Sequence, residues 1–246
     1  MGSAAFDFDE VFDEDYLYFY GPRLEESADA QVDVIWRLLS LGHGTKVLDL
    51  ACGHGRIANR LAHRGASVSG LDASHMFLAR AREHATQAGV EVDYVDGDMR
   101  SLPWPDESFD CVISWFTSFG YFEDRENRRV LHEIRRVLRP GGRALIENNN
   151  LVSLLPRWLP SMVVERDGHF AIDRSEFDPT SGRATTERVV VRDGRVRRFH
   201  VSVRMFVAVE LRDWLRAAGF NLVDFFGPDG ERLTEGSQRM ITVATR

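Results

Sequence analysis

The chain is poor in cysteine, and its two cysteines, Cys52 and Cys111, fall at the ends of predicted core strands. Two cysteines in such places are typical of small buried side chains in a reducing compartment, not of a disulfide framework. They also lack the clustered spacing of a metal site. We therefore expect no disulfide and no bound metal.

Long apolar runs are absent as well. No run approaches the roughly 20 residues that a membrane-spanning helix needs, so we expect no membrane segment. The first stretch, MGSAAFDFDEVFDEDY, is acidic and lacks a basic segment followed by an apolar one. We therefore expect no signal peptide and a cytoplasmic protein.

Lysine is almost missing, because Lys46 is the only one among 31 lysine and arginine residues. We interpret this bias as codon preference rather than phosphate recognition. The formal net charge is −7, which argues against a nucleic-acid partner. With 43% apolar residues in 246, the chain can still form a large α/β domain with an insertion.

The stretch from Lys46 to Arg56, KVLDLACGHGR, is the most informative part of the sequence. A short apolar run, a glycine turn and a helical pattern predict a buried parallel strand, a tight loop and a helix start. Glycine lets a ligand lie against the backbone, and a helix start offers unpaired N–H groups. Asp72 ends the next apolar run, where an acid can accept both hydroxyls of a ribose. These features predict a nucleoside site.

Strand and helix patterns alternate through the first 150 residues. We predict strands at residues 46–51, 67–71, 91–96, 109–115 and 142–148, and helices at 24–41, 55–64, 74–88 and 124–138. Such alternation predicts an α/β fold with an open, mostly parallel sheet and helices on both faces. Right-handed crossovers then place the carboxyl ends of the strands at one edge, where ligands bind.

We divide the chain into four segments. Residues 1–44 form an N-terminal lid and helical segment, and residues 45–150 form the nucleoside-binding core. Turns and alternating stretches in residues 151–206 predict a short helix and inserted antiparallel hairpins. Residues 207–246 supply a helix and two last strands, an antiparallel pair at the sheet edge. The hairpins would either meet the substrate or build a homo-oligomer interface.

Aromatic and acidic residues are interleaved near the N-terminus. The rings belong to Phe6, Phe8, Phe12, Tyr16, Tyr18, Phe19 and Tyr20. We interpret this segment as a lid over a pocket, and the alternative is an arm that packs on the domain surface. Arg23 follows, where it could reach an anionic ligand group.

A glycine turn alone also fits a nicotinamide-dependent dehydrogenase, so further features must decide. Gly53-x-Gly55-Arg56 lacks the third glycine of a pyrophosphate-binding turn. Asp98 and Met99 follow the third strand, where the carboxylate can accept a hydrogen bond from an adenine amino group and the Met99 N–H can bind the ring nitrogen. Both features favour a single compact nucleoside over a dinucleotide.

At this point the chain resembles the class I S-adenosylmethionine-dependent methyltransferases. The resemblance covers roughly residues 45–150 and is carried by VLDLACGHGR, GLDAS, GDMRSLPWPDESFD and LRPGG. It implies a Rossmann-like seven-stranded sheet in the order 3-2-1-4-5-7-6 and S-adenosylmethionine as the methyl donor. It also implies a role for each residue that matches the family's motifs.

The resemblance implies cofactor contacts along the strand ends. The methionine part of the cofactor would lie against Asp49, Ala51, Gly53 and Gly55, and the ribose against Asp72. The adenine would lie against Ala73, Met76, Asp98 and Met99. Ser114 would lie near the sulfonium. Tyr20 and Arg23 would close over the cofactor from the N-terminal side. Tyr16, Phe116 and Glu147 would position the acceptor, with Glu147 holding an amine or a hydroxyl. Aromatic walls around the sulfonium would come from Tyr16, Tyr20, Trp115, Phe116, Phe119 and Tyr121.

The predicted activity is methylation of a small molecule. SWFTSF stands where an N/D-P-P-Y sequence would mark amino methylation of nucleic-acid bases or protein glutamine. Because no residue is a clear general base, we favour N-methylation of an amine, and the layout resembles methyltransferases of antibiotic biosynthesis. An O-methyltransferase that uses His169 or His200 is the alternative. A nicotinamide-dependent dehydrogenase and a catalytically silent cofactor-binding protein are further alternatives.

Overall fold

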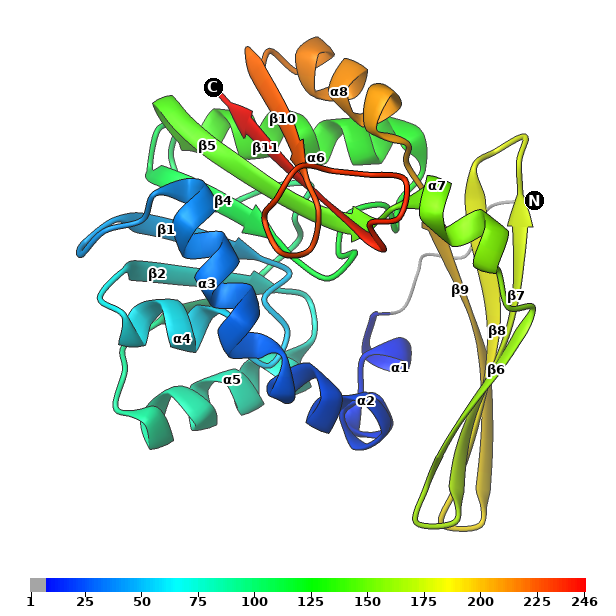
Figure 1. Cartoon of the computed structure of the whole chain (residues 1–246). Coiled ribbons are helices and arrows are strands. Elements are labelled where there is room, and N and C mark those ends of the chain that lie inside the picture. Colours follow the sequence, from blue (N-terminus) through cyan, green and yellow to red (C-terminus); the bar gives the residue numbers. More distant parts are fainter. Residues whose placement is uncertain (1–7) are drawn as a thin grey trace.

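A computed structural model of the protein describes residues 8–246. Phe6 and the rest of the first seven residues lie outside this range. Within it the chain forms a seven-stranded sheet flanked by helices and a separate four-stranded sheet. Figure 1 shows the two N-terminal helices, α1 (Phe8–Val11) and α2 (Glu14–Glu26), between the two sheets.

The large sheet has the strand order that the resemblance implies. Its strands are β1 (Lys46–Leu50), β2 (Ser67–Asp72), β3 (Asp93–Asp96), β4 (Phe109–Ser114), β5 (Leu138–Asn149), β10 (Leu222–Phe226) and β11 (Arg239–Thr245). They follow the order β3-β2-β1-β4-β5-β11-β10. The first five are parallel, and β11 runs antiparallel to both β5 and β10. The predicted fold class is therefore confirmed.

Helices cover both faces of the large sheet because its strands alternate their apolar side chains (Figure 1). Val47 belongs to the core with α3 (Ala28–Leu39), α4 (Ala58–His63) and α5 (His75–Ala88). Its neighbour Leu48 belongs to the core with α6 (Asp124–Val137) and α8 (Ala208–Ala217) on the other face.

The N-terminal helices begin earlier than predicted. We expected one helix over residues 24–41, whereas the structure has α2 and α3 with Ser27 between them. The side chain of Asp13 accepts the N–H of Tyr16 at 3.1 Å and caps α2. The hydroxyl of Ser27 lies within 3.3 Å of the carbonyl oxygens of Arg23 and Leu24 and satisfies the last turn of α2. Local capping thus starts a helix inside the acidic aromatic segment.

The insertion consists of a short helix and hairpins, as the turn pattern predicts. After α7 (Leu151–Leu154) and the 3₁₀ turn η1 (Leu155–Arg157) come four antiparallel strands, β6 (Ser161–Arg166), β7 (His169–Asp178), β8 (Arg183–Arg192) and β9 (Arg195–Arg204). One face of this sheet packs Ala171, Val190 and Phe199 against Val11 and Phe19 of the N-terminal helices. The lid segment is thus attached to the insertion. No helix of the described chain is long and apolar enough to cross a membrane.

Candidate active site

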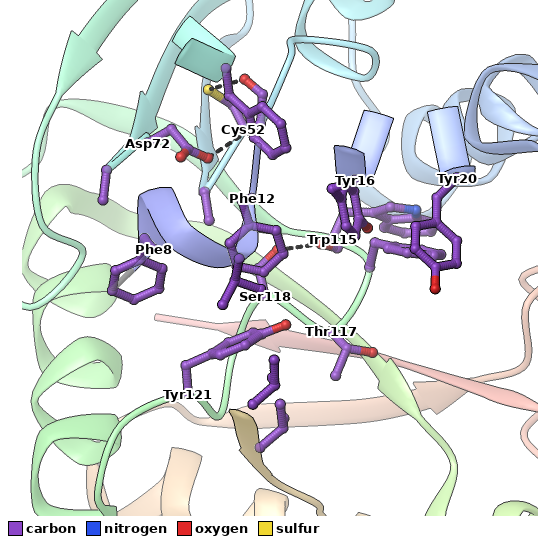
Figure 2. A pocket seen from close by; sticks show the side chains of 18 of the residues that line it. Phe8, Phe12, Tyr16, Tyr20, Cys52, Asp72, Trp115, Thr117, Ser118 and Tyr121 are labelled. Carbon is purple, nitrogen blue, oxygen red and sulfur yellow. Dashed lines mark hydrogen bonds between the residues drawn. The ribbon is translucent and has the colours of Figure 1, made fainter. Parts of the chain in front are cut away.

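A cavity of about 500 Å³ lies at the carboxyl ends of the parallel strands. Its floor comes from the loops after β1, β2, β3 and β4, its roof from α1 and α2, and its far wall from β8 and β9. Figure 2 shows Asp72 on the core side and the rings of Phe12, Tyr16 and Tyr121 projecting into the same space. The ring of Phe12 lies 5.7 Å from that of Tyr121 and 6.1 Å from that of Phe77. The N-terminal aromatic segment therefore covers a pocket.

The glycine turn after β1 contains two glycines with different tasks. Ala51 and Gly53 line the cavity, and Gly53 has a left-handed φ of +56°. Gly55, the other glycine for which we expected a cofactor contact, does not line the cavity. A Cβ on Gly55 would lie 2.3 Å from the hydroxyl of Tyr94. Gly55 is therefore required by packing beneath the turn.

The carboxylate of Asp72 fixes this turn and faces the cavity. Its Oδ2 accepts the N–H of Gly53 at 2.7 Å, and its Oδ1 accepts the N–H of Ser74 at 2.9 Å. Burial raises the pKa of Asp72, although these backbone bonds oppose the shift. Each oxygen keeps a further lone pair, so the carboxylate fits a ribose diol. Ala73 also lines the cavity beside it.

Asp49 is a buried carboxylate beneath the same turn. It is 2% exposed, lines the cavity, and its Oδ2 has no hydrogen-bond partner in the described part of the chain. Burial raises its pKa to about 7, and the nearby charge of Asp72 adds to the shift while Arg56 opposes it. An unpartnered buried carboxylate oxygen fits a cationic ligand. This observation matches the positively charged methionine part of S-adenosylmethionine.

Asp98 and Met99, which we expect at the adenine edge, line the cavity after β3. The carboxylate of Asp98 accepts Nη2 of Arg100 at 2.6 Å, and this pairing lowers the pKa of Asp98 although burial opposes the shift. Met76, expected against adenine, does not line the cavity. The next residue, Phe77, does line the cavity, because Phe77 and not Met76 lies on the buried face of α5.

The loop after β4 has a strained backbone. Residues 115–118 line the cavity, and Phe116 and Thr117 both have left-handed φ angles, 62° and 59°. Two consecutive non-glycine residues in this region are uncommon and are typical of functional sites. The strain exposes the Phe116 ring, which is 42% exposed, at the cavity. Phe116 thus lines the cavity, and its role in positioning the acceptor stays a prediction.

Glu147 supports this loop and does not face the cavity. It is 3% exposed, accepts the N–H of Phe116 at 2.7 Å, and forms an ion pair with Arg239. We expected Glu147 to hold an amine or a hydroxyl of the acceptor; in the structure the guanidinium of Arg239 and the N–H of Phe116 bind its carboxylate instead. Ser114 is also buried and is not part of the cavity lining.

Helix α2 contributes Tyr16 and Tyr20 to the cavity but not Arg23. Arg23 is exposed in the last turn of α2. Arg56, and not Arg23, is the arginine that lines the cavity beside the glycine turn. It is 7% exposed, donates to the side chain of Gln31 at 2.5 Å and lies 5.4 Å from the centre of the Phe116 ring. Its position directly after the glycine turn was the signal that could have identified it.

We call the part of the cavity away from the strand ends and next to β8 and β9 the far half. It is aromatic and basic, and its lining includes Tyr16, Tyr20, Tyr121, Arg188 and Arg239. Burial raises the pKa of Tyr16, and it raises that of Tyr20 to about 12, so these phenols stay protonated near neutral pH. Of the six predicted aromatic walls, five line the cavity; Phe119 instead stacks on Phe206 in the core.

Potential general bases are scarce around the cavity. The carboxylates among the described lining residues are Asp49 in β1, Asp72 at the end of β2 and Asp98 after β3, and the lining histidine is His54. His169 and His200 do not line the cavity. His169 lies 3.6 Å from the carboxylate of Asp193. The far half therefore has neither a carboxylate nor a histidine in the described chain.

Comparisons with known proteins agree with this site. Residues 47–142 match the sequence model of a family described as "Methyltransferase domain". A demethylmenaquinone methyltransferase from Thermus thermophilus is 40% identical over 103 residues, which cover 41% of this chain and 46% of that protein. A 27-O-demethylrifamycin SV methyltransferase from Amycolatopsis mediterranei is 36% identical over 132 residues, covering 52% and 47%. The chain thus spans about half the length of these curated relatives.

The whole fold also has counterparts among solved structures. The sugar N-methyltransferase KedS8 from Streptoalloteichus sp. superimposes with a TM-score of 0.74, over 100% of this chain and 98% of that one, at 21% identity. The similarity includes the insertion, since it covers the full chain. Residues 47–142 thus form a methyltransferase domain, and the predicted resemblance to the class I S-adenosylmethionine-dependent methyltransferases, with S-adenosylmethionine as methyl donor, is confirmed.

Proposed function

We propose that this protein transfers a methyl group from S-adenosylmethionine to an amine nitrogen of a small molecule, in the biosynthesis of a natural product such as an antibiotic. Ala51, Gly53 and Asp49 would hold the methionine part of the cofactor, with Arg56 available for its carboxylate. Asp72 would hold the ribose, and the adenine would lie near Phe77 and Asp98. When bound, the cofactor supplies an activated methyl group on a sulfonium.

Among residues 8–246 no carboxylate or histidine lines the far half of the cavity, and this observation carries the choice of an amine. A neutral amine attacks with its own lone pair; as the new N–C bond forms, the C–S bond breaks and its electron pair stays on sulfur. The product ammonium can lose its proton to solvent, so no side chain needs to remove one first. An alcohol has no such route, since its hydroxyl proton must be removed during attack.

The residues around the reacting atoms align the acceptor and exclude water. Tyr16 and Phe116 line the cavity with aromatic rings. Walls of this kind hold a nucleophile in line with the C–S bond and keep water out. Their rings can also attract a sulfonium through cation–π contact. Tyr16 and Phe116 therefore act by positioning, not by proton transfer.

O-methylation of a small-molecule hydroxyl is the second candidate. It is favoured by the similarity to 27-O-demethylrifamycin SV methyltransferase, whereas the similarity to the sugar N-methyltransferase KedS8 favours nitrogen. The use of the insertion as a homo-oligomer interface and the limits of the four chain segments stay predictions.

Two measurements test the proposal. Calorimetry should show binding of S-adenosylhomocysteine and no binding of NAD, and the reverse result would point to a dehydrogenase. Transfer of a tritiated methyl group to a panel of amines and alcohols should label amines. Labelling of oxygen acceptors only would reject the choice of nitrogen, and cofactor binding without any labelling would indicate a silent cofactor-binding protein.

A further inference from the structure

Arg188 is the basic residue that β8 places in the far wall of the cavity. Its side chain is 15% exposed and pairs with Asp173, which is 8% exposed and stands directly opposite on β7. Nε donates to one carboxylate oxygen at 2.6 Å, and Nη2 donates to the other at 2.7 Å. Two parallel bonds of this kind fix the plane of the guanidinium.

The second edge of the same guanidinium is open. A guanidinium has five N–H donors, and Asp173 engages the two on the Nε side. Within residues 8–246, Nη1 of Arg188 has no hydrogen-bond partner. Asp173 does not line the cavity, so the pair presents its positive member to the ligand space. The ring of Tyr20 lies 4.9 Å from the guanidinium carbon and packs on its face.

Arg239, the other arginine of the far half, is not available in this way. Its nitrogens donate to Glu147, to Asn149 and to the hydroxyl of Thr117. No carboxylate of the described chain lines this half. Arg188 is therefore the place where this wall can bind a ligand through a free charged donor.

We infer that the acceptor carries a carboxylate that binds the open Nη1–Nη2 edge of Arg188. This inference rests on the proposed function and specifies the acceptor as an amine that also bears an acid. Two carboxylate oxygens match the two N–H groups of that edge, and the phenol of Tyr16 lines the same cavity as a further donor. An acceptor whose only charge is an ammonium would be repelled by the guanidinium of Arg188, because no carboxylate of the described chain lines this half of the cavity.

The test uses benzoate, benzamide and benzylamine as probes of equal shape and different charge. The full-length protein is saturated with S-adenosylhomocysteine, and each probe is titrated by calorimetry. We expect benzoate to bind at least about tenfold more tightly than benzamide, with benzylamine weakest. Equal affinities, no binding of benzoate, or a preference for benzylamine would overturn the inference. Phenyl phosphate that bound more tightly than benzoate would overturn the choice of a carboxylate.

A double variant isolates the charge of Arg188. Because Arg188→Gln alone would leave Asp173 buried without a partner, Arg188→Gln is combined with Asp173→Asn, which keeps a neutral hydrogen-bonded pair. We expect the double variant to lose the preference for benzoate and to bind S-adenosylhomocysteine as before. Arg174→Gln is the matched control, since Arg174 is 59% exposed and pairs with Glu187 on the same sheet. A preference that survives in the double variant would assign the site to another residue.

The two proposals can fail separately. If the wild-type protein binds S-adenosylhomocysteine but shows no preference for benzoate, only the inference is rejected. If the wild-type protein does not bind S-adenosylhomocysteine, the proposed function fails. In that case the probe titrations are made on the protein alone, where the same tenfold preference and its loss in the double variant still decide the role of Arg188.

Discussion

Arg239 and Glu147 form a two-pronged ion pair beneath the loop that ends β4. Nη2 of Arg239 donates to Oε2 of Glu147 at 2.6 Å, and Nε donates to Oε1. The two residues come from the neighbouring strands β11 and β5. Oε2 of Glu147 also accepts the N–H of Phe116 at 2.7 Å, so the pair fixes the strained loop that exposes the Phe116 ring.

Glu147→Ala should destabilise the protein strongly. The substitution leaves Arg239 in a mostly buried position without its counter-ion and frees the N–H of Phe116. Breaking a buried pair in this way costs roughly 3–5 kcal/mol. The free energy of unfolding in urea measures the effect. Glu231→Ala is the control, because Glu231 is 75% exposed and lies 3.8 Å from Arg37; it should cost less than about 1 kcal/mol. Equal losses in both variants would show that Glu147 does not support the loop.

Asp72→Ala should weaken the binding of S-adenosylhomocysteine. Two charge-assisted hydrogen bonds to the ribose would be lost, which corresponds to roughly 2–3 kcal/mol. Calorimetry at neutral pH measures the change. The control is Asp96→Ala, since Asp96 ends the neighbouring strand β3, is 51% exposed and pairs with His75. Unchanged affinity in Asp72→Ala would refute the ribose assignment.

The fold was predictable because its signals are local. The apolar run before the glycine turn identifies β1, and the helical pattern that follows belongs to a βαβ unit whose handedness allows one arrangement. Asp72 and Asp98 were found for the same reason, since parallel strand ends meet at one edge whatever the details of packing. The break at Ser27 was missed because it depends on local bonds of the Ser27 hydroxyl to the carbonyl oxygens of Arg23 and Leu24, which the apolar periodicity does not show.

The side chains that face the cavity were less predictable, because their directions depend on packing. A shift of one residue in helical phase separates Phe77, which lines the cavity, from Met76, which does not. Arg188 reaches the site from a strand more than a hundred residues after the glycine turn, so no spacing in the sequence connects them. Glu147 lies in the expected strand, yet its pairing with Arg239 on β11 and its support of the loop after β4 could not be read from the sequence.

Gly55→Ala should destabilise the protein more than an alanine at an uncrowded glycine. Gly55 has a φ of +79°, and a Cβ there would lie 2.3 Å from the hydroxyl of Tyr94, which donates to Asn59 at 2.7 Å. Gly89→Ala is the control, because Gly89 has a φ of +65° and no atom within 4 Å of the Cβ position. Backbone strain alone costs about 1–2 kcal/mol, and the displaced Tyr94 hydrogen bond adds roughly 1–3 kcal/mol to the Gly55 variant.

Thermal and urea unfolding of the two glycine variants measure the difference. Tyr94→Phe removes the hydroxyl that the new Cβ would strike, so adding it to Gly55→Ala should recover part of the loss. Equal destabilisation of the Gly55 and Gly89 variants would contradict the packing role of Gly55 and return it to the cofactor site.

Asp49 should make the stability of the protein depend on pH in a defined window. Burial raises its folded-state pKa to about 7, whereas an exposed aspartate titrates near about 4. Between these values the folded state keeps the proton that the unfolded state has lost, so stability falls as the pH rises. The slope can reach about 1.4 kcal/mol per pH unit and disappears above the folded-state pKa, where both states are charged.

Asp49→Asn removes this titration. Between pH 5 and pH 7 the free energy of unfolding of the wild-type protein should therefore fall relative to that of the variant, with the slope given above. Asp224→Asn on the exposed face of β10 is the control and should follow the wild type.

A positively charged ligand favours the ionised carboxylate of Asp49, so the affinity for S-adenosylmethionine should instead rise with pH over the same window. Urea unfolding and calorimetry at several pH values give the two curves. Parallel stability curves for wild type and Asp49→Asn would show that the buried carboxylate is already ionised at pH 5, and the cationic site assigned to it would need another origin.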